Sequence, residues 1–239
     1  MAEGKGVADL QSLEVSKIRS NFDYQQIGRW LSFSADPVSV EDFLANIILY
    51  PHALPLSVRE LEFQQALIRE IIRSDQKEEE VDSLVVSDEV LKICRSPQEG
   101  LSIVLDGYLP QGIVKVFSMT EDGLKVATAI CFEGEIGRGK KGDQIAEVVL
   151  DFGLAQKQKV LLEEDDLVLI PARAEDKVIA QIKCFKNFKI GGKKDFKVEV
   201  TGGAAGIVFD TRGRPFKFPD FSAEGRIRLV RWRKALGII

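Results

Sequence analysis

Residues 202–219, GGAAGIVFDTRGRPFKFP, are the stretch that says most about the fold. A glycine pair opens the stretch, an apolar run follows, and a second short apolar run closes it. Gly213 supplies the freedom that a turn with positive φ requires, and proline is tolerated at the first position of a strand. The pattern therefore predicts a hairpin in which the strands 206–210 and 215–219 are joined by the turn 211–214.

The charged residues of this turn allow two interpretations. Asp210 can lock the bend by accepting hydrogen bonds from turn N–H groups or by pairing with Arg212 or Arg214. Two arginines exposed at a loop tip can instead bind an anion. Asp210, Arg212, Gly213 and Arg214 are therefore candidate residues of a structural turn or of an anion-binding site, and we favour the structural turn.

The rest of the C-terminal half contains strand-length apolar runs punctuated by Gly, Asp and Lys. These runs lie at 146–152, 158–164, 166–172, 177–185 and 195–200. After them, residues 223–237 return to a helical period. The apolar side chains of one helix face are Leu229, Trp232 and Leu236. The pattern predicts a β-barrel or sandwich-like module with a C-terminal helix over 134–239.

The N-terminal half contains the clearest helix, which begins after Ser57. Ser57 and Glu60 have the spacing of a capping box, in which each side chain satisfies a free N–H of the other residue. One face of this helix carries Leu61, Leu67, Ile68, Ile71 and Ile72. The polar residues that we expect to face water are Glu62, Arg69 and Arg73.

Runs rich in β-branched residues, alternating with short helical stretches, predict strands of a buried sheet at 83–87, 101–110 and 112–118. The predicted fold class is therefore α+β or α/β. Residues 1–34 form an N-terminal extension, 35–133 a small α/β subdomain, and 134–239 the β-barrel or sandwich-like module with its terminal helix.

Composition indicates an ordinary globular protein. The net charge of −4 and the pI near 5.3 argue against a general binder of nucleic acid or membrane surfaces. No apolar run approaches the roughly 18 residues of a membrane helix, and the first residues lack the apolar core of a signal peptide. The three cysteines lie far apart in apolar sequence, as reduced, buried thiols do: Cys94, Cys131 and Cys184. These features predict a cytoplasmic protein.

Motifs for cofactors, metals and catalysis are weak. Residues 137–142, GRGKKG, match GxGxxG literally, but the following sequence alternates like a strand, whereas a dinucleotide site requires a helix there. The single histidine, His52, and the lack of a CxxC pair argue against a metal site. We therefore expect no cofactor and no metal, and no motif supports catalytic activity of the chain on its own.

Basic and aromatic residues alternate at 183–197, where Phe185, Phe188 and Phe196 stand among six lysines. In a nucleic-acid-binding surface, bases would stack on exposed phenylalanines of this kind. In a strand pair, the phenylalanines would point inward and the lysines outward. The acidic net charge favours the strand pair.

Several stretches resemble the MutL family of the glutamate mutase neighbourhood, which is unrelated to the mismatch-repair proteins of the same name. Residues 202–219 resemble the glycine-rich D-[AT]-RGRP signature near the end of these proteins. Other stretches that resemble the family are 27–33, 44–74, 101–124 and the terminal RWRKALG. The likeness runs from about residue 28 to the end.

The resemblance implies the C-terminal half of an actin-like, ATPase-type protein that supports or reactivates a B12-dependent mutase. The family's phosphate-binding half has no counterpart here. Asp88 and Glu89 stand where the family carries the glycines that contact adenosine, so this is a degenerate nucleotide position, and we expect no ATP binding.

These features predict a non-enzymatic interaction or assembly domain. Its partner is expected to be another protein, with a B12-dependent mutase implied by the resemblance, or a second copy of the chain. The alternative functions are a fragment of an ATP-dependent mutase reactivation factor and a nucleic-acid-binding module that uses the stretch 183–197.

Overall fold

The structure, a computed structural model, describes residues 6–10, 24–51, 53–74, 81–119, 124–136, 143–153 and 156–239. The chain forms two compact units. Unit 1 comprises the described parts of Met1–Asp9, Glu79–Val85 and Pro110–Lys217. Unit 2 comprises those of Leu10–Glu78, Val86–Leu109 and Phe218–Ile239. Each unit collects three separate segments, so the boundaries differ from the predicted sequential division at residues 34 and 133.

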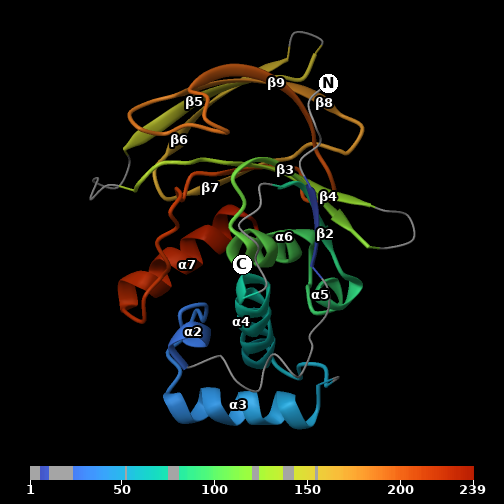
Figure 1. The fold of residues 1–239 in the computed structure, drawn as a ribbon, viewed down its shortest axis with the longest axis vertical. Helices are drawn as coiled ribbons and strands as arrows, with labels where there is room; N and C mark the ends of the chain where they lie inside the picture. The colour runs from blue at the N-terminus through green and yellow to red at the C-terminus, as the bar shows by residue number, and fades with distance from the viewer. Residues whose placement is uncertain are drawn as a thin grey trace. The chain divides into compact units, whose positions relative to one another are not determined.

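Unit 1 is built from two β-sheets, which Figure 1 shows as two layers. The six-stranded sheet has the order β1-β2-β3-β4-β10-β7, and the four-stranded sheet has the order β6-β5-β8-β9. The strands are β1 (Gly6–Leu10), β2 (Val81–Val86), β3 (Gly112–Ser118), β4 (Lys125–Cys131), β5 (Gln144–Asp151), β6 (Lys157–Glu163), β7 (Leu167–Ile170), β8 (Lys177–Cys184), β9 (Asp195–Thr201) and β10 (Ile207–Asp210). The strands predicted at 112–118 and between 146 and 210 are confirmed. The predicted N-terminal extension contributes a strand, β1.

Strand β10 lies between β4 and β7. It pairs in parallel with β4, where Ile207 is opposite Thr128, and antiparallel with β7, where Ile207 is opposite Ile170. All four of its residues are buried. The predicted hairpin partner at 215–219 is wrong, because both edges of β10 are already hydrogen-bonded and the chain after it forms turns and irregular backbone.

The two sheets of unit 1 share one apolar core. Its buried residues come from strands of both sheets and from the loops beside them: Ile130, Phe132, Ile145, Ala146, Val148, Leu150, Leu162, Ile170, Val178, Ala180, Ile182, Cys184, Phe188, Ile190, Val200, Ile207 and Phe209. Two separate sheets around one core form a sandwich-like arrangement, and the described strands do not close into a barrel. Strands β7 and β10 pair within the sheet of β3 and β4. Neither strand is hydrogen-bonded to the sheet of β5, β6, β8 and β9, so the two sheets stay separate.

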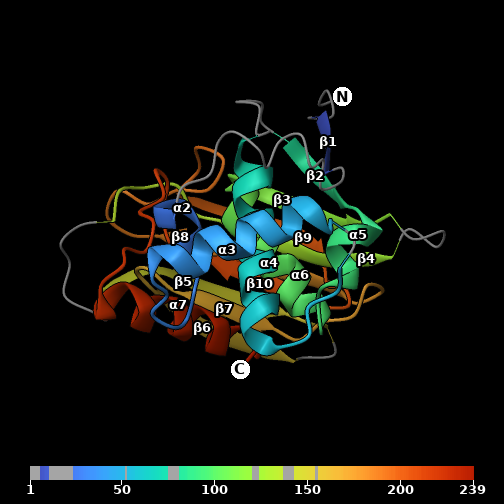
Figure 2. The ribbon, with the colours of Figure 1, turned by 90° about the horizontal axis from the view of Figure 1, so that it is seen from below.

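Unit 2 is helical. Its elements are α2 (Tyr24–Gly28), α3 (Pro37–Leu49), α4 (Val58–Ser74), α5 (Asp88–Lys92), α6 (Pro97–Tyr108) and α7 (Ala223–Ala235). Figure 2 shows α3 running across α4. The C-terminal helix is confirmed, with Leu229, Trp232 and Leu236 buried and Gly237 at a φ of +70° just beyond its end.

The start of α4 follows the predicted capping residues. The Glu60 N–H donates to Ser57 Oγ at 3.1 Å, as in a capping box. The Glu60 carboxylate accepts from the N–H of Leu56 at 2.7 Å, one residue before the position that the motif predicts. The pair therefore fixes the N-terminus of α4 and the chain that leads into it.

Residues 101–110 were predicted as a strand, and this prediction is wrong. Residues 101–108 belong to α6, which begins after Ser96, and Ser96 Oγ accepts from the N–H of Glu99 at 3.3 Å. Pro97 occupies the first helical turn, where its missing N–H costs nothing. Every residue from Glu99 to Tyr108 is buried, which removes the amphipathic period that identifies a surface helix.

The prediction that Glu62 and Arg69 face water is also wrong. Arg69 is 2% exposed, and its Nε donates to Asp106 Oδ2 at 2.8 Å. Its Nη2 donates to Ser102 Oγ at 3.2 Å, so α4 and α6 are joined by a buried ion pair with a satisfied hydroxyl. Glu62 accepts from Arg233 Nη1 of α7 at 2.9 Å. Both side chains point inward because each has a charged partner there, Asp106 for Arg69 and Arg233 for Glu62. These partners lie far away in the sequence, so the helical period alone did not reveal them.

Replacing Arg69 with methionine should lower the free energy of unfolding by about 3–5 kcal/mol, because the Asp106 carboxylate is then buried without its cation. Chemical denaturation measures the loss. The double variant Arg69→Met/Asp106→Leu removes both charges and should recover most of it. Arg73→Met is the matched control, because Arg73 is partly exposed and its partner Glu70 keeps other donors. A single-variant loss no larger than that of the control would contradict the prediction.

Candidate functional site

The turn after β10 contains a buried cluster of one carboxylate and two guanidinium groups. Arg212 donates from Nε to Asp210 Oδ1 at 2.9 Å and from Nη2 to Oδ2 at 2.8 Å. The Arg212 backbone N–H also donates to Oδ1, at 3.1 Å. Arg214 Nη2 donates to Oδ2 at 3.1 Å. The pairing of Asp210 with an arginine, expected from the sequence, is thus present with both arginines.

Contacts on every side fix the same turn. Arg214 donates from Nε to the carbonyl of Pro110 at 3.2 Å, and its backbone exchanges two hydrogen bonds with Gly134. Gly213 has a φ of +74°, as predicted, and a Cβ added there would lie 2.6 Å from the Gly134 carbonyl oxygen. The ring of Phe216 lies 5.0 Å from the Arg212 guanidinium carbon. The turn therefore has no space for a larger residue at position 213.

Solvent does not reach the centre of this cluster. Asp210 and Arg212 are both 0% exposed, and the side chain of Arg214 is 4% exposed. Guanidinium groups committed to a buried carboxylate are poor ligands for an anion from solution. The geometry therefore favours a lock of the turn over an anion site.

The other predicted site residues lie in unit 2. Asp88 is exposed and is the first residue of α5, whose N-cap Ser87 accepts from the N–H of Val90 at 3.4 Å. Glu89 belongs to the same five-residue helix, and its side chain lies outside the described part. The degenerate nucleotide position implied by the resemblance stays a prediction.

Two sequence motifs fall outside the described residues, namely GRGKKG at 137–142 and His52. The described chain after GRGKKG enters a strand, β5, and between residues 143 and 222 the described residues contain no helix. Among the described residues, no group of three or more His, Cys, Asp or Glu side chains is arranged to hold a metal ion. None of the described helices has both the length and the apolar character needed to cross a bilayer.

The stretch 183–197 contains the end of β8, the start of β9 and the turn-rich connection between them, so the favoured strand pair is present at its two ends. Phe188 is buried in the core of unit 1, and Phe185 and Phe196 are partly buried. The six lysines are all exposed: Lys183, Lys186, Lys189, Lys193, Lys194 and Lys197. Phenylalanines that fill a core cannot stack on bases, so this stretch does not support a nucleic-acid surface.

The three cysteines are free thiols without a reactive environment. Burial raises the pKa of Cys94 and of Cys131 to about 12, with Glu99 and Asp210 adding to the two effects. Burial likewise raises the pKa of Cys184 to about 11. A thiol must ionise to act as a nucleophile, so none of the three is a candidate catalytic residue.

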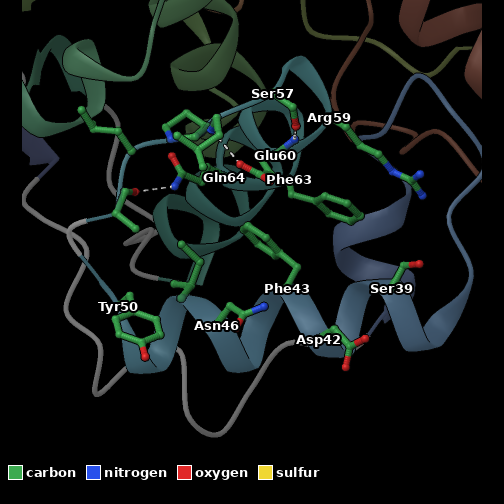
Figure 3. A pocket seen from close by; sticks show the side chains of 15 residues that line it. Ser39, Asp42, Phe43, Asn46, Tyr50, Ser57, Arg59, Glu60, Phe63 and Gln64 are labelled. Atoms are coloured by element: carbon green, nitrogen blue, oxygen red, sulfur yellow. Dashed lines mark hydrogen bonds between the residues drawn. The ribbon is translucent and has the colours of Figure 1, made fainter.

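A pocket of about 510 Å³ lies between α3 and the N-terminal half of α4 (Figure 3). Its volume falls in the range of ligand-binding pockets. Phe43 points from α3 toward Phe63 of α4, and the two rings stack with centroids 4.9 Å apart. Ile47 adds a buried aliphatic side chain. These three residues form an apolar floor.

Polar groups and a loop surround this floor. Gln64 donates from Nε2 to the carbonyl of Ala53 at 2.9 Å and so holds the loop between α3 and α4 over the pocket. Arg59 lies over the ring of Phe33, 4.8 Å from its centroid. Asp42, Asn46 and Glu60 also line the pocket. The pocket is thus shaped by fixed hydrogen bonds and ring contacts.

Large apolar side chains are exposed in the segment 38–58, which contributes most of the pocket lining, and three of them, Tyr50, Leu54 and Leu56, line the pocket. We call them the α3–α4 surface: Val38, Leu49, Tyr50, Leu54, Leu56 and Val58. They include more than half of the exposed large apolar side chains in the described residues, within a segment of 21 positions, 38–58. Leu56 is 92% exposed and Leu54 is 69% exposed. Exposed apolar side chains that gather in this way mark sites of interaction.

This pocket was not predicted from the sequence. A signal is present in the apolar run IILYPHALPLSV, residues 47–58, whose two prolines exclude a regular helix. An apolar run that is neither helix nor strand has no regular way to bury its side chains.

Comparison of the chain with family models, curated proteins and solved structures finds no match.

Asp210→Asn should lower the free energy of unfolding by about 3–5 kcal/mol at neutral pH, because two buried guanidinium groups lose their carboxylate. Gly213→Ala should cost more than the roughly 1 kcal/mol of a positive-φ position, because its Cβ also meets a carbonyl oxygen. Urea denaturation of both variants measures these losses. Gly153→Ala, also at positive φ but with no atom near its Cβ, is the control. Equal losses of unfolding free energy for Gly153→Ala and Gly213→Ala would contradict the predicted clash of the Cβ at position 213 with the carbonyl oxygen.

The effect of Asp210→Asn should depend on pH. Burial alone would raise the pKa of Asp210, but Arg212 and Arg214 outweigh it and hold that pKa well below its ordinary value of 3.8. The stabilisation by Asp210 is therefore complete above the unfolded-state pKa and is lost as the pH falls toward the folded-state value. The difference in unfolding free energy between the parent and the variant should narrow as the pH is lowered from about 5 to about 3. A constant difference would contradict this assignment.

Mg-ATP should not bind to the chain, because Asp88 opens α5 where the resemblance places an adenosine-contacting glycine. Isothermal titration calorimetry should show no heat of binding. A dissociation constant in the low micromolar range would contradict the prediction and favour the reactivation-factor function.

Proposed function

We propose that this chain is a non-enzymatic interaction module that binds a partner protein through the α3–α4 surface. The observation that carries the proposal is a pocket lined by the exposed apolar side chains of Tyr50, Leu54 and Leu56, in a segment, 38–58, that exposes three more: Val38, Leu49 and Val58. Burial of a fully exposed Leu or Val side chain contributes about 1.5–3 kcal/mol. A partner that covers Leu54 and Leu56 therefore gains the free energy of burying both side chains.

Several features support binding over catalysis. Asp210, which is fully buried in unit 1, is paired with two arginines, so its carboxylate is not available as a general acid or base. The thiols have raised pKa values. The pocket contains aromatic and aliphatic side chains and a few polar groups, which suit the recognition of an apolar side chain.

The resemblance to the MutL family of the glutamate mutase neighbourhood indicates which partner to test first. A B12-dependent mutase is the partner class that this resemblance implies, and an actin-like origin of the α/β part belongs to the same proposal. A second copy of the chain is the other partner to test.

The test is capture of proteins from an extract of the source cells by three immobilised chains: the parent, Leu56→Asp and Leu161→Asp. Leu161 is an exposed apolar residue of β6, so its variant is a matched control for the added charge. Capture of one partner, such as a mutase subunit, by the parent and the control but not by Leu56→Asp supports the proposal. Equal capture by all three chains, or none by the parent, overturns it.

Light scattering after size exclusion tests the second copy as the partner. If the parent forms an oligomer that Leu56→Asp alone disrupts, the α3–α4 surface binds itself. If all three chains are monomers, the partner is a different protein.

A further inference from the structure

We infer that the partner contributes an amphipathic segment in which large apolar residues are flanked by Lys or Arg. This inference rests on the proposed function, because it concerns the chemistry of what the α3–α4 surface binds. It is carried by two independent features, the apolar pocket and the charge around it.

The charge around the pocket is acidic. The acidic side chains that line the pocket are Asp42 and Glu60, and Asp36 accepts hydrogen bonds from the lining residue Ser39; all three acidic side chains are exposed. The basic side chain among the lining residues is Arg59, which is held over the ring of Phe33. A partner that covers the apolar side chains therefore approaches an acidic rim, which attracts cations and repels anions.

The shape of the surface favours an extended segment over a small molecule. Tyr50, Leu54 and Leu56 line the pocket, but Val38 and Leu49 are exposed on α3 beyond its lining. Val38, Asp42 and Leu49 lie along one side of the helix at its spacing of three to four residues. An amphipathic helix places one apolar side chain in a pocket and the next ones along such a row.

A membrane surface fits these observations less well. Anionic lipid headgroups would meet the exposed carboxylates of Asp36, Asp42 and Glu60, which is unfavourable at low ionic strength. Peripheral membrane sites combine apolar residues with Lys and Arg, the opposite of the rim seen here.

The test uses two synthetic helical peptides of the same length, one of repeating Leu and Lys and one with Glu in place of every Lys. Fluorescence anisotropy measures the binding of each to the parent chain. The Leu/Lys peptide should bind at least about tenfold more tightly than the Leu/Glu peptide, and added salt should weaken it.

Three variants separate this surface from a general attraction of cations to an acidic protein. Asp42→Lys should weaken binding of the Leu/Lys peptide at least about fivefold. Glu175→Lys, an equal charge change at an exposed position of unit 1, should leave it unchanged. Leu54→Asp adds a negative charge and should still abolish binding, because the apolar contact is lost. Melting temperatures equal to that of the parent show that these exposed substitutions leave the fold intact.

Failure of this inference is distinguishable from failure of the proposed function. If the Leu/Glu peptide binds as tightly as the Leu/Lys peptide, if neither peptide binds, or if Glu175→Lys matches Asp42→Lys, the basic partner is excluded. Capture that depends on Leu56 is measured separately and is unaffected by those outcomes. Stronger binding of the Leu/Lys peptide to Leu54→Asp would show charge attraction alone and would also overturn the inference.

Discussion

The helices of unit 2 are arranged around the charges that α4 carries into the interior. Glu70 has a fully buried carboxylate, which accepts from Trp30 Nε1 at 2.6 Å, from Arg29 Nε at 3.1 Å and from Arg73 Nη2 at 2.7 Å. A buried carboxylate is tolerated only when donors satisfy it, so the segment around α2 must stay against α4. Arg69 imposes the same requirement on α6. Charge pairing thus joins α4 to α6, α7 and the segment after α2, whereas α3 contacts α4 through the stacked rings of Phe43 and Phe63.

Unit 1 meets an equivalent constraint by a different route. Its core is apolar, and the charges of Asp210 and its two arginines sit where the central strand β10 ends. Because Arg214 exchanges backbone hydrogen bonds with Gly134, the end of β10 is fastened to the segment that follows β4. The RGRP stretch is therefore explained by the need to stop a buried strand and hold the exit of the chain. An aspartate and two arginines close together in sequence are also typical of a catalytic or anion-binding loop, so the sequence alone does not distinguish the two roles.

Local signals predicted most of unit 1 and little of the arrangement of unit 2. Alternating apolar residues mark the strands from β5 to β10 because each strand lies in a sheet with a buried face. The period fails for α6, which is buried on all sides, although Ser96 and Pro97 marked its start. Arg69 looked like a surface residue because its partner Asp106 lies 37 positions away. The pocket was not predictable for a similar reason, since Phe43 and Phe63 meet only after α3 folds across α4.

The position of β10 in its sheet has a consequence for how the chain folds. Strands β3 and β4 are joined by a short connection, but the parallel partner of β4 is supplied some 80 residues later, at Ile207 opposite Thr128. Contacts between such distant positions carry a large loop-closure entropy and slow the folding step that forms them. During synthesis, β4 therefore has one edge without a partner until β10 has left the ribosome. In the sheet of β5, β6, β8 and β9 the most distant paired residues, Ala146 and Cys184, are 38 positions apart, so this sheet can form in that interval and offer a surface on which the late strand is placed.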